Sequence, residues 1–252
     1  MILGTYLAYA IAMIVFHPGA IYPFAPDPFD DPAYNQEIIG SRDVTIAVSE
    51  GTDSLAVLFF MGNGGALGFF SDTLDAHQEA GRTVVALAYR GGGGVAGNPS
   101  EAGLKADALA AYDWLAAKHD GPIAVHGFSL GTGLAVHVAA RRPVAAVLLD
   151  APYARLCSLM AQAAWVPACY MPGVQKWDTT RDVDALSAPV LIQHGVEDQL
   201  IPLAQGKALA DLMRDAGLDV GYHAIKNATH NDLAGQPGYR DRIDAFLAQA
   251  VD

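Results

Sequence analysis

The chain has 252 residues, of which 52% are hydrophobic, and it carries a formal net charge of −12 with only 15 Lys and Arg residues. This length and apolar content suffice for one large core, so a single globular domain is expected. The shortage of cations argues against a nucleic-acid partner, because phosphate binding needs basic side chains that displace counterions. It also argues against binding to an anionic membrane surface. The two cysteines, Cys157 and Cys169, are too few for a disulfide scaffold and lack the spacing of a zinc site.

The amino-terminal segment is unusually apolar. Residues 1–16 carry no charge, and no Lys or Arg occurs before Arg42. As a helix this run would measure about 24 Å, short of the roughly 30 Å hydrocarbon core unless the apolar residues beyond Pro18 extend it. We expect residues 1–22 to form a membrane anchor and residues 23–36, rich in Pro and Asp, to form a linker. A cleaved signal peptide and a helix packed on the domain of a cytoplasmic protein are the alternatives.

From residue 37 to residue 252, predicted strands alternate with predicted helices. Strands are expected at 43–49, 54–61, 83–89, 122–127, 144–150, 189–194 and 219–225, and helices at 72–80, 101–118, 130–141, 204–216 and 238–250. This order indicates an α/β fold with a mostly parallel central sheet and helices on both faces. The first two strands are expected to form an antiparallel hairpin. Residues 151–188 separate two strands by more than one helix needs, which predicts a small helical cap.

A glycine-rich stretch, YRGGGGVAGNPSE at residues 89–101, contains the pattern G-x-G-x-x-G. A dinucleotide-binding loop would place this pattern at the first βα turn, with an acidic residue at the end of the next strand. Here the next helix begins only after Pro99, with Ser100 as its N-cap, and the following strand ends in His126 and Gly127. We therefore interpret the stretch as a turn at the carboxyl edge of the sheet.

A second glycine motif carries a candidate nucleophile. The sequence HGFSLGTG, at residues 126–133, places Ser129 between Gly127 and Gly131 where a predicted strand meets a predicted helix. The pattern G-x-S-x-G at such a junction is typical of a nucleophile elbow. The glycines are needed because the sharp turn strains the serine backbone, and a Cβ two residues away would collide. The helix amino end also favours developing negative charge.

A serine hydroxyl needs a base and an acid. Asp198 follows the strand at 189–194, and His230 follows the strand at 219–225, so the chain order is Ser, Asp, His. Asp150, which ends the strand at 144–150, is the alternative acid. Five of the other seven histidines are interpreted as structural: His126, His137 and His194 as core residues, and His77 and His119 as helix-surface residues.

The two donors of an oxyanion hole are expected from backbone N–H groups. Leu130 supplies one directly after the nucleophile. Asn63 supplies the other from the sequence MGNGG at residues 61–65, for which a plain glycine turn is the alternative.

Together the motifs MGNGG, NPSEAGL, GFSLG, DAPY, KWD, HGVEDQLIP and THND resemble the α/β-hydrolase superfamily over residues 37–250. The resemblance is to abhydrolase-domain serine hydrolases, many of which carry an amino-terminal membrane anchor, and it implies the α/β-hydrolase fold. Two features depart from the family: Met61 replaces the usual His before Gly-Asn, and four glycines follow Tyr89-Arg90 where an aromatic residue and a serine are common. The glycine-rich stretch then forms the rim of the active site.

The resemblance implies a small-molecule acyl substrate, an ester, thioester or lipid, cleaved through an acyl-enzyme without metal or cofactor. The cap would contribute an apolar acyl pocket, unless its side chains serve only to pack its helices: Tyr153, Leu156, Met160, Trp165 and Tyr170. A serine peptidase of the aminopeptidase type and a non-catalytic, membrane-tethered interaction protein are the alternative functions. If the anchor places the catalytic domain on the outer side of the membrane, that location would permit a disulfide between Cys157 and Cys169.

Overall fold

The structure is a computed structural model that describes residues 2–251, so the first residue of the predicted anchor and the last residue of the predicted domain lie outside it. Eight strands form one sheet in the order β1-β2-β4-β3-β5-β6-β7-β8. Strands β3 to β8 are parallel, whereas β2 pairs antiparallel with both β4 and β1. The strands are β1 (Asn35–Ile39), β2 (Val44–Ser49), β3 (Ala56–Phe60), β4 (Thr83–Ala88), β5 (Ile123–Phe128), β6 (Ala146–Asp150), β7 (Val190–Gly195) and β8 (Val220–Ile225).

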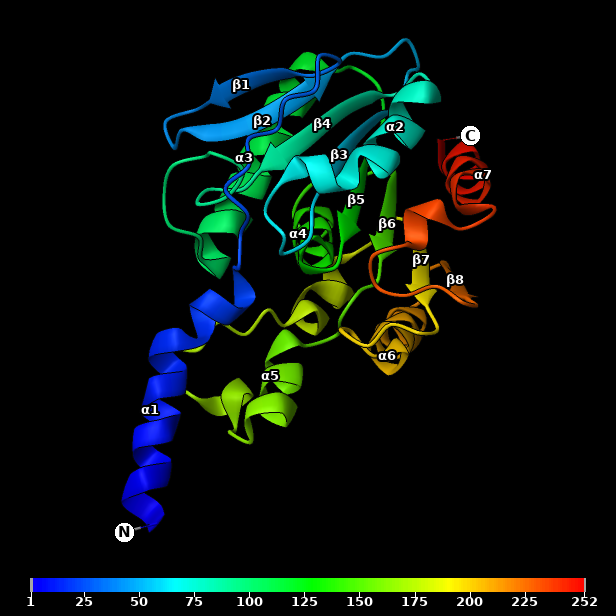
Figure 1. The fold of residues 1–252 in the computed structure, drawn as a ribbon. Helices are drawn as coiled ribbons and strands as arrows, with labels where there is room; N and C mark the ends of the chain where they lie inside the picture. The colour runs from blue at the N-terminus through cyan, green and yellow to red at the C-terminus, as the bar shows by residue number, and fades with distance from the viewer. Residues whose placement is uncertain (1, 252) are drawn as a thin grey trace.

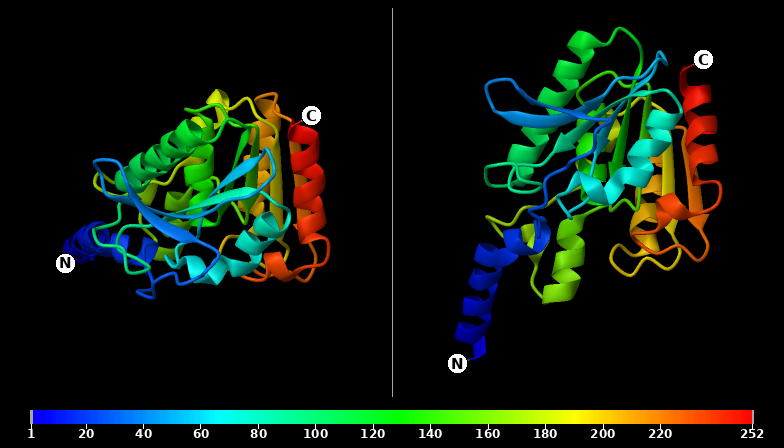
Figure 2. Two further views of the ribbon diagram at one scale, coloured as in Figure 1. Left: turned by 90° about the horizontal axis from the view of Figure 1, so that it is seen from above. Right: turned by 45° about the horizontal axis from the view of Figure 1, so that its top comes forward.

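Helices cover both faces of this sheet (Figures 1 and 2). Helices α3, α4 and α6 pack on one face, and α2 and α7 pack on the other. Every residue of β3 is buried, as expected for a strand covered on both sides. The predicted mostly parallel α/β fold is therefore confirmed. The helices are α1 (Ile2–Ile21), α2 (Ser71–Glu79), α3 (Glu101–Lys118), α4 (Leu130–Ala139), α5 (Leu156–Ala164), α6 (Leu203–Asp215) and α7 (Tyr239–Val251).

The expected hairpin between the first two predicted strands is wrong, because β4 lies between β2 and β3. The turn after β2 is bound to the turn before β4: the N–H groups of Thr52 and Asp53 both donate to the Gly81 carbonyl at 2.8 Å. These bonds direct the chain past β4 into the central position of β3. Strand β1, which sequence reasoning missed, has mostly exposed side chains and therefore gives no apolar pattern.

The segment 23–36 packs against the domain instead of forming the expected linker. Phe29 and Tyr34 are buried and contact each other, with their ring centroids 5.3 Å apart. The N–H of Ala25 donates to the Gly64 carbonyl at 2.7 Å. Burial of these aromatic rings outweighs the Pro and Asp content on which the expectation rested.

The glycine-rich stretch holds this same segment. The N–H of Gly93 donates to the Ala25 carbonyl at 2.8 Å. A Cβ on Gly92 would lie 2.6 Å from the Gly65 carbonyl oxygen and 2.9 Å from Cβ of Phe24, so only glycine fits there. The structure has one cavity beside Ser129 and a second beside His230. None of the four consecutive glycines lines either of them. The expected position at the active-site rim is corrected accordingly.

The insert between β6 and β7 lies beside α1 at one end of the molecule (Figure 1). It contains α5 and two 3₁₀ helices, η2 (Ala168–Tyr170) and η3 (Thr179–Ala185). A disulfide joins Cys157 of α5 to Cys169 of η2. Within α1, the stretch Gly4–Ile21 is long and apolar enough to cross a membrane, by length and composition.

Candidate active site

Ser129 lies on the tight turn between β5 and α4. Its backbone has φ 49° and ψ −115°, a conformation that is strained for a residue with a side chain. A Cβ on Gly131 would lie 2.1 Å from the Phe60 carbonyl oxygen, and one on Gly127 would lie 2.5 Å from the Gly131 carbonyl oxygen. The two flanking glycines therefore permit the turn, as the motif predicts.

His230 and Asp198 form a continuous hydrogen-bonded chain with this serine. Nε2 of His230 lies 3.0 Å from Oγ of Ser129, and Nδ1 of His230 lies 2.7 Å from Oδ2 of Asp198. The parallel pairing of β7 with β8 brings the two loops together, because both strands end at the same edge of the sheet. A carboxylate only accepts hydrogen bonds, so Nδ1 carries the proton and Nε2 accepts from the serine hydroxyl.

The environment of Asp198 favours its ionised form. Burial by itself raises the pKa of this carboxyl group, but hydrogen bonds from His194, from His230 and from the backbone N–H of Ile201 lower it well below its usual range. Oδ1 accepts from the N–H groups of Leu200 and Ile201 at 2.9 and 2.8 Å. The side chain is thus a fixed anion behind His230.

His194, which sequence reasoning assigned only to the core, contacts Asp198. It is buried, and its Nε2 lies 2.9 Å from the Ile201 carbonyl oxygen and 3.3 Å from Oδ2 of Asp198. The sequence signal that could have found it is its position at the end of β7, four residues before Asp198.

Asp150, the alternative acid, lies in a separate buried network. Its Oδ2 accepts from the Tyr239 hydroxyl at 2.5 Å and from Nε2 of His126 at 3.0 Å. Nδ1 of His126 in turn lies 2.9 Å from Nε2 of His77. No hydrogen bond joins Asp150 to His230 among the described residues.

The expectation that His77 is a surface residue is wrong, because its side chain is buried against β5. Burial lowers its pKa well below the usual value, and nearby His126 and Arg82 lower it further. His126 and His137 are buried, as expected. His126 is hydrogen-bonded to Asp150 at 3.0 Å, and His137 is hydrogen-bonded to Asp182 at 3.1 Å.

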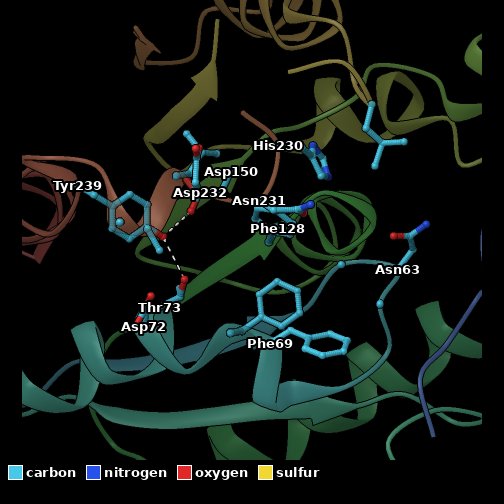
Figure 3. Close-up of a pocket in the computed structure, with 17 residues that line it drawn as sticks. Asn63, Phe69, Asp72, Thr73, Phe128, Asp150, His230, Asn231, Asp232 and Tyr239 are labelled. Atoms are coloured by element: carbon cyan, nitrogen blue, oxygen red, sulfur yellow. Dashed lines mark hydrogen bonds between the residues drawn. The ribbon is translucent and has the colours of Figure 1, made fainter. Parts of the chain in front are cut away.

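Two cavities meet at this hydrogen-bonded chain. The Ser129 cavity has a volume of about 540 Å³, and the His230 cavity has a volume of about 660 Å³ (Figure 3). Asn63 and Leu200 line both of them. Three carboxylates line the His230 cavity, those of Asp72, Asp150 and Asp232.

The wall of the Ser129 cavity is mainly apolar and comes from five parts of the chain, two of which are the loops that contain Asn63 and Leu200. Leu130, the first residue of α4, follows Ser129, and Tyr153, Leu156 and Met160 come from the insert. Sequence reasoning missed Leu159, which its spacing from Leu156 could have indicated. It also missed the end of α1, where Ala20 and Ile21 line the cavity, since only tertiary packing brings them there.

Trp165 and Tyr170 do not line this cavity, which corrects the expectation for these two pocket residues. Their exposed fractions are 86% and 89%. Trp165 ends α5 in the left-handed conformation, with φ 54°, and this turn directs the chain away from the Ser129 cavity. Within residues 2–251, His, Cys, Asp and Glu side chains nowhere form a group of three or more that could hold a metal ion.

The fold and site define a hydrolase of the α/β-hydrolase superfamily, of the esterase or lipase type. The profile of the dienelactone hydrolase family matches residues 95–245, and the chain belongs to this family. An uncharacterized protein of Mycobacterium tuberculosis is 32% identical over 209 residues, which cover 81% of this chain and 73% of the relative. The lysophosphatidylserine lipase ABHD12 of Xenopus tropicalis is 29% identical over 74% of this chain. The matched region spans about half of that lipase, 53% of its length.

Solved structures show the same fold. An esterase of Pyrococcus furiosus superposes with a TM-score of 0.72 at 15% identity, covering 90% of this chain and 97% of that chain. An esterase of Thermogutta terrifontis, with propionate bound, gives a TM-score of 0.67 at 19% identity, covering 86% of this chain and 94% of that chain.

Proposed function

We propose that the protein is a serine hydrolase that cleaves carboxylic esters through an acyl-enzyme intermediate. The observation that carries this proposal is the hydrogen-bonded chain from Ser129 through His230 to Asp198. The hydrogen bonds run from nucleophile to base to acid, and His230 carries its proton on Nδ1, so that Nε2 is free to accept the proton of the serine hydroxyl.

In the first half of the reaction, Nε2 of His230 accepts the proton of the Ser129 hydroxyl as Oγ bonds to the acyl carbon. The carbonyl π electrons move to its oxygen, and the N–H groups of Leu130 and Asn63 stabilise the resulting oxyanion. Asp198 stabilises the imidazolium. When the tetrahedral intermediate collapses, the bond to the alcohol oxygen breaks and His230 donates its proton to that oxygen.

In the second half, water takes the place of the alcohol. His230 accepts a proton from the water as its oxygen attacks the acyl carbon, and the proton returns to Oγ of Ser129 as the acid leaves. No metal or cofactor takes part in either half.

The two cavities suggest where the two halves of the ester lie. The acyl group occupies the Ser129 cavity, because this cavity contains the nucleophile and apolar side chains such as Leu156 and Met160. The alcohol occupies the His230 cavity, because His230 must reach the leaving oxygen. Each methylene buried on the acyl side contributes about 0.8 kcal/mol, a factor of about 4 in kcat/KM.

An aminopeptidase on the same three residues is less well supported. Such an enzyme needs an anion on the acyl side to bind the α-ammonium group of its substrate, and no carboxylate lines the Ser129 cavity in the described part of the chain. Lipid esters fit this cavity better, in line with the lipase activity named for the ABHD12 relative. We further propose that residues 1–22 attach the enzyme to a membrane.

Labelling with a fluorophosphonate tests the proposal. The wild-type protein is expected to be labelled, Ser129→Ala to lose labelling and at least about 10⁴-fold in kcat, and the surface control Ser54→Ala to behave as wild type. p-Nitrophenyl esters of increasing acyl length, compared with alanine p-nitroanilide, separate the esterase from the peptidase. Equal labelling of wild type and Ser129→Ala would contradict the proposal by moving the nucleophile to another residue. Absence of both labelling and hydrolysis would favour the non-catalytic alternative.

A further inference from the structure

Four stretches of 18 or more residues lack charged side chains, and two of them, residues 54–71 and 121–140, belong mostly to the buried core of the domain. The other two lie outside that core. Residues 1–26 and residues 156–175 contain no Asp, Glu, Lys or Arg, although the chain has 27 acidic and 15 basic residues. The first segment contains α1, and the second, which we call the cap segment, contains α5 and η2. Charges are thus excluded from these two parts of an otherwise acidic protein.

These two uncharged segments pack against each other along most of α1. The Tyr6 hydroxyl donates to the Trp165 carbonyl at 3.1 Å, and the Tyr9 hydroxyl donates to the Ala164 carbonyl at 2.8 Å. Further along, Nε2 of His17 accepts from the N–H of Gln175 at 3.0 Å. Apolar side chains of both segments form one cluster around the disulfide, with Ala10, Met13 and Ile14 against Val166, Ala168 and Met171. Helix α1 and the cap segment therefore lie side by side, so a bilayer that holds α1 would also contact the cap segment.

The outer surface of this pair of segments is apolar and rich in exposed aromatic rings. On α1, Leu7, Val15 and Phe16 are 59%, 62% and 72% exposed, and on the cap segment Trp165 and Tyr170 are 86% and 89% exposed. Trp and Tyr favour the interface between headgroups and acyl chains.

The Ser129 cavity lies between the same two segments. Ala20 and Ile21 of the first segment and Leu156, Leu159 and Met160 of the cap segment line it, together with Ser129 itself. An acyl chain that leaves a bilayer at this point would move between apolar walls to the nucleophile without crossing water.

We propose that α1 and the cap segment insert together into one leaflet of a lipid bilayer, and that acyl chains enter the Ser129 cavity directly from that leaflet. The bound partner is the lipid surface, held by apolar burial and aromatic anchors rather than by charge. The entry route rests on the proposed hydrolase function, whereas the insertion of the cap segment does not. Because this contact is apolar, its strength should not fall with salt.

Flotation of the full-length protein with neutral phosphatidylcholine vesicles tests the insertion. The wild-type protein is expected to float with the vesicles at low and at high salt. The double variant Trp165→Asp/Tyr170→Asp, with α1 intact, should bind at least 10-fold more weakly. Ile38→Asp is the matched control, because Ile38 is 72% exposed on β1, away from the cap segment, and it should float as wild type does. Circular dichroism checks that each variant is folded.

Brominated lipids and two substrates complete the test. Bromine in the upper acyl chain should quench tryptophan emission in the wild type, and Trp165→Phe should remove most of that quenching while it still floats. The double variant should hydrolyse a soluble p-nitrophenyl ester as wild type does but should lose at least 10-fold on a long-chain ester embedded in vesicles. Flotation of the double variant equal to that of wild type, or absence of quenching, would overturn the insertion of the cap segment. Failure of the proposed function is distinguishable, because it would abolish hydrolysis of both substrates while flotation and quenching persist.

Discussion

The hydrogen bonds around Asp198 predict that Asp198→Asn stops the reaction by changing the tautomer of His230. An Asn side chain has one acceptor oxygen, and the N–H groups of Leu200 and Ile201, which lie 2.9 and 2.8 Å from Oδ1, would hold that oxygen. The amide NH₂ would then face Nδ1, which lies 2.7 Å from Oδ2 in the wild type. Nδ1 would have to accept, so the proton would move to Nε2, which could no longer accept the proton of Ser129.

The expected loss is about 10⁴-fold in kcat, the size known for the same substitution in a serine protease. This factor corresponds to about 5.5 kcal/mol in transition-state stabilisation. Steady-state hydrolysis of p-nitrophenyl butyrate measures it, with circular dichroism to show that the variant is folded. Asp150→Asn is the matched control, since Asp150 also ends a strand at this edge but has no bond to His230, and we expect it to keep its rate within about 10-fold. A folded Asp198→Asn variant that keeps a tenth of the wild-type rate, or the reverse order of the two variants, would refute the reasoning.

Three further predictions concern stability. Asp150→Asn should lower the free energy of unfolding by about 1–3 kcal/mol, because it disturbs buried hydrogen bonds; urea titration measures this, and an unchanged midpoint would contradict it. Burial alone raises the pKa of Asp182, but hydrogen bonds from His137 and Arg141 outweigh it and lower this pKa to about 2. The ionised carboxylate therefore stabilises the folded protein fully above its unfolded-state pKa of about 3.9, and this stabilisation is lost as pH falls through 2. Asp182→Asn should therefore lose less Tm between pH 5 and pH 2 than wild type does, and an equal loss would count against it. Reduction of the disulfide should remove about 3 kcal/mol of loop-closure stabilisation from the cap. Limited proteolysis should then cleave the cap faster, and equal cleavage rates with and without reductant would show that the disulfide does not stabilise it.

Local features of the sequence determined the fold class and most element boundaries. The predicted helix at 101–118 has the same bounds as α3, because its N-cap is local: the Ser100 hydroxyl accepts from the N–H of Gly103 at 3.1 Å. The runs of the buried strands were equally visible, since a strand buried on both faces is continuously apolar, whereas the mostly exposed β1 was missed. The turn at Ser129 was also predictable, because it needs glycines two residues before and two residues after it, where a Cβ would collide.

Tertiary structure alone decided which of these pieces meet. Whether β2 pairs with β3 or with β4 depends on contacts between segments far apart in the chain, and the hairpin expectation failed there. The same holds for the partner of His230, since Asp198 and Asp150 end neighbouring strands and only the arrangement of loops above the sheet separates them. The outward position of Trp165 and the place of Ile21 in the cavity wall follow from the packing of α1 against the insert. Apolar composition makes burial favourable for such side chains but does not specify which surface, protein or lipid, covers them.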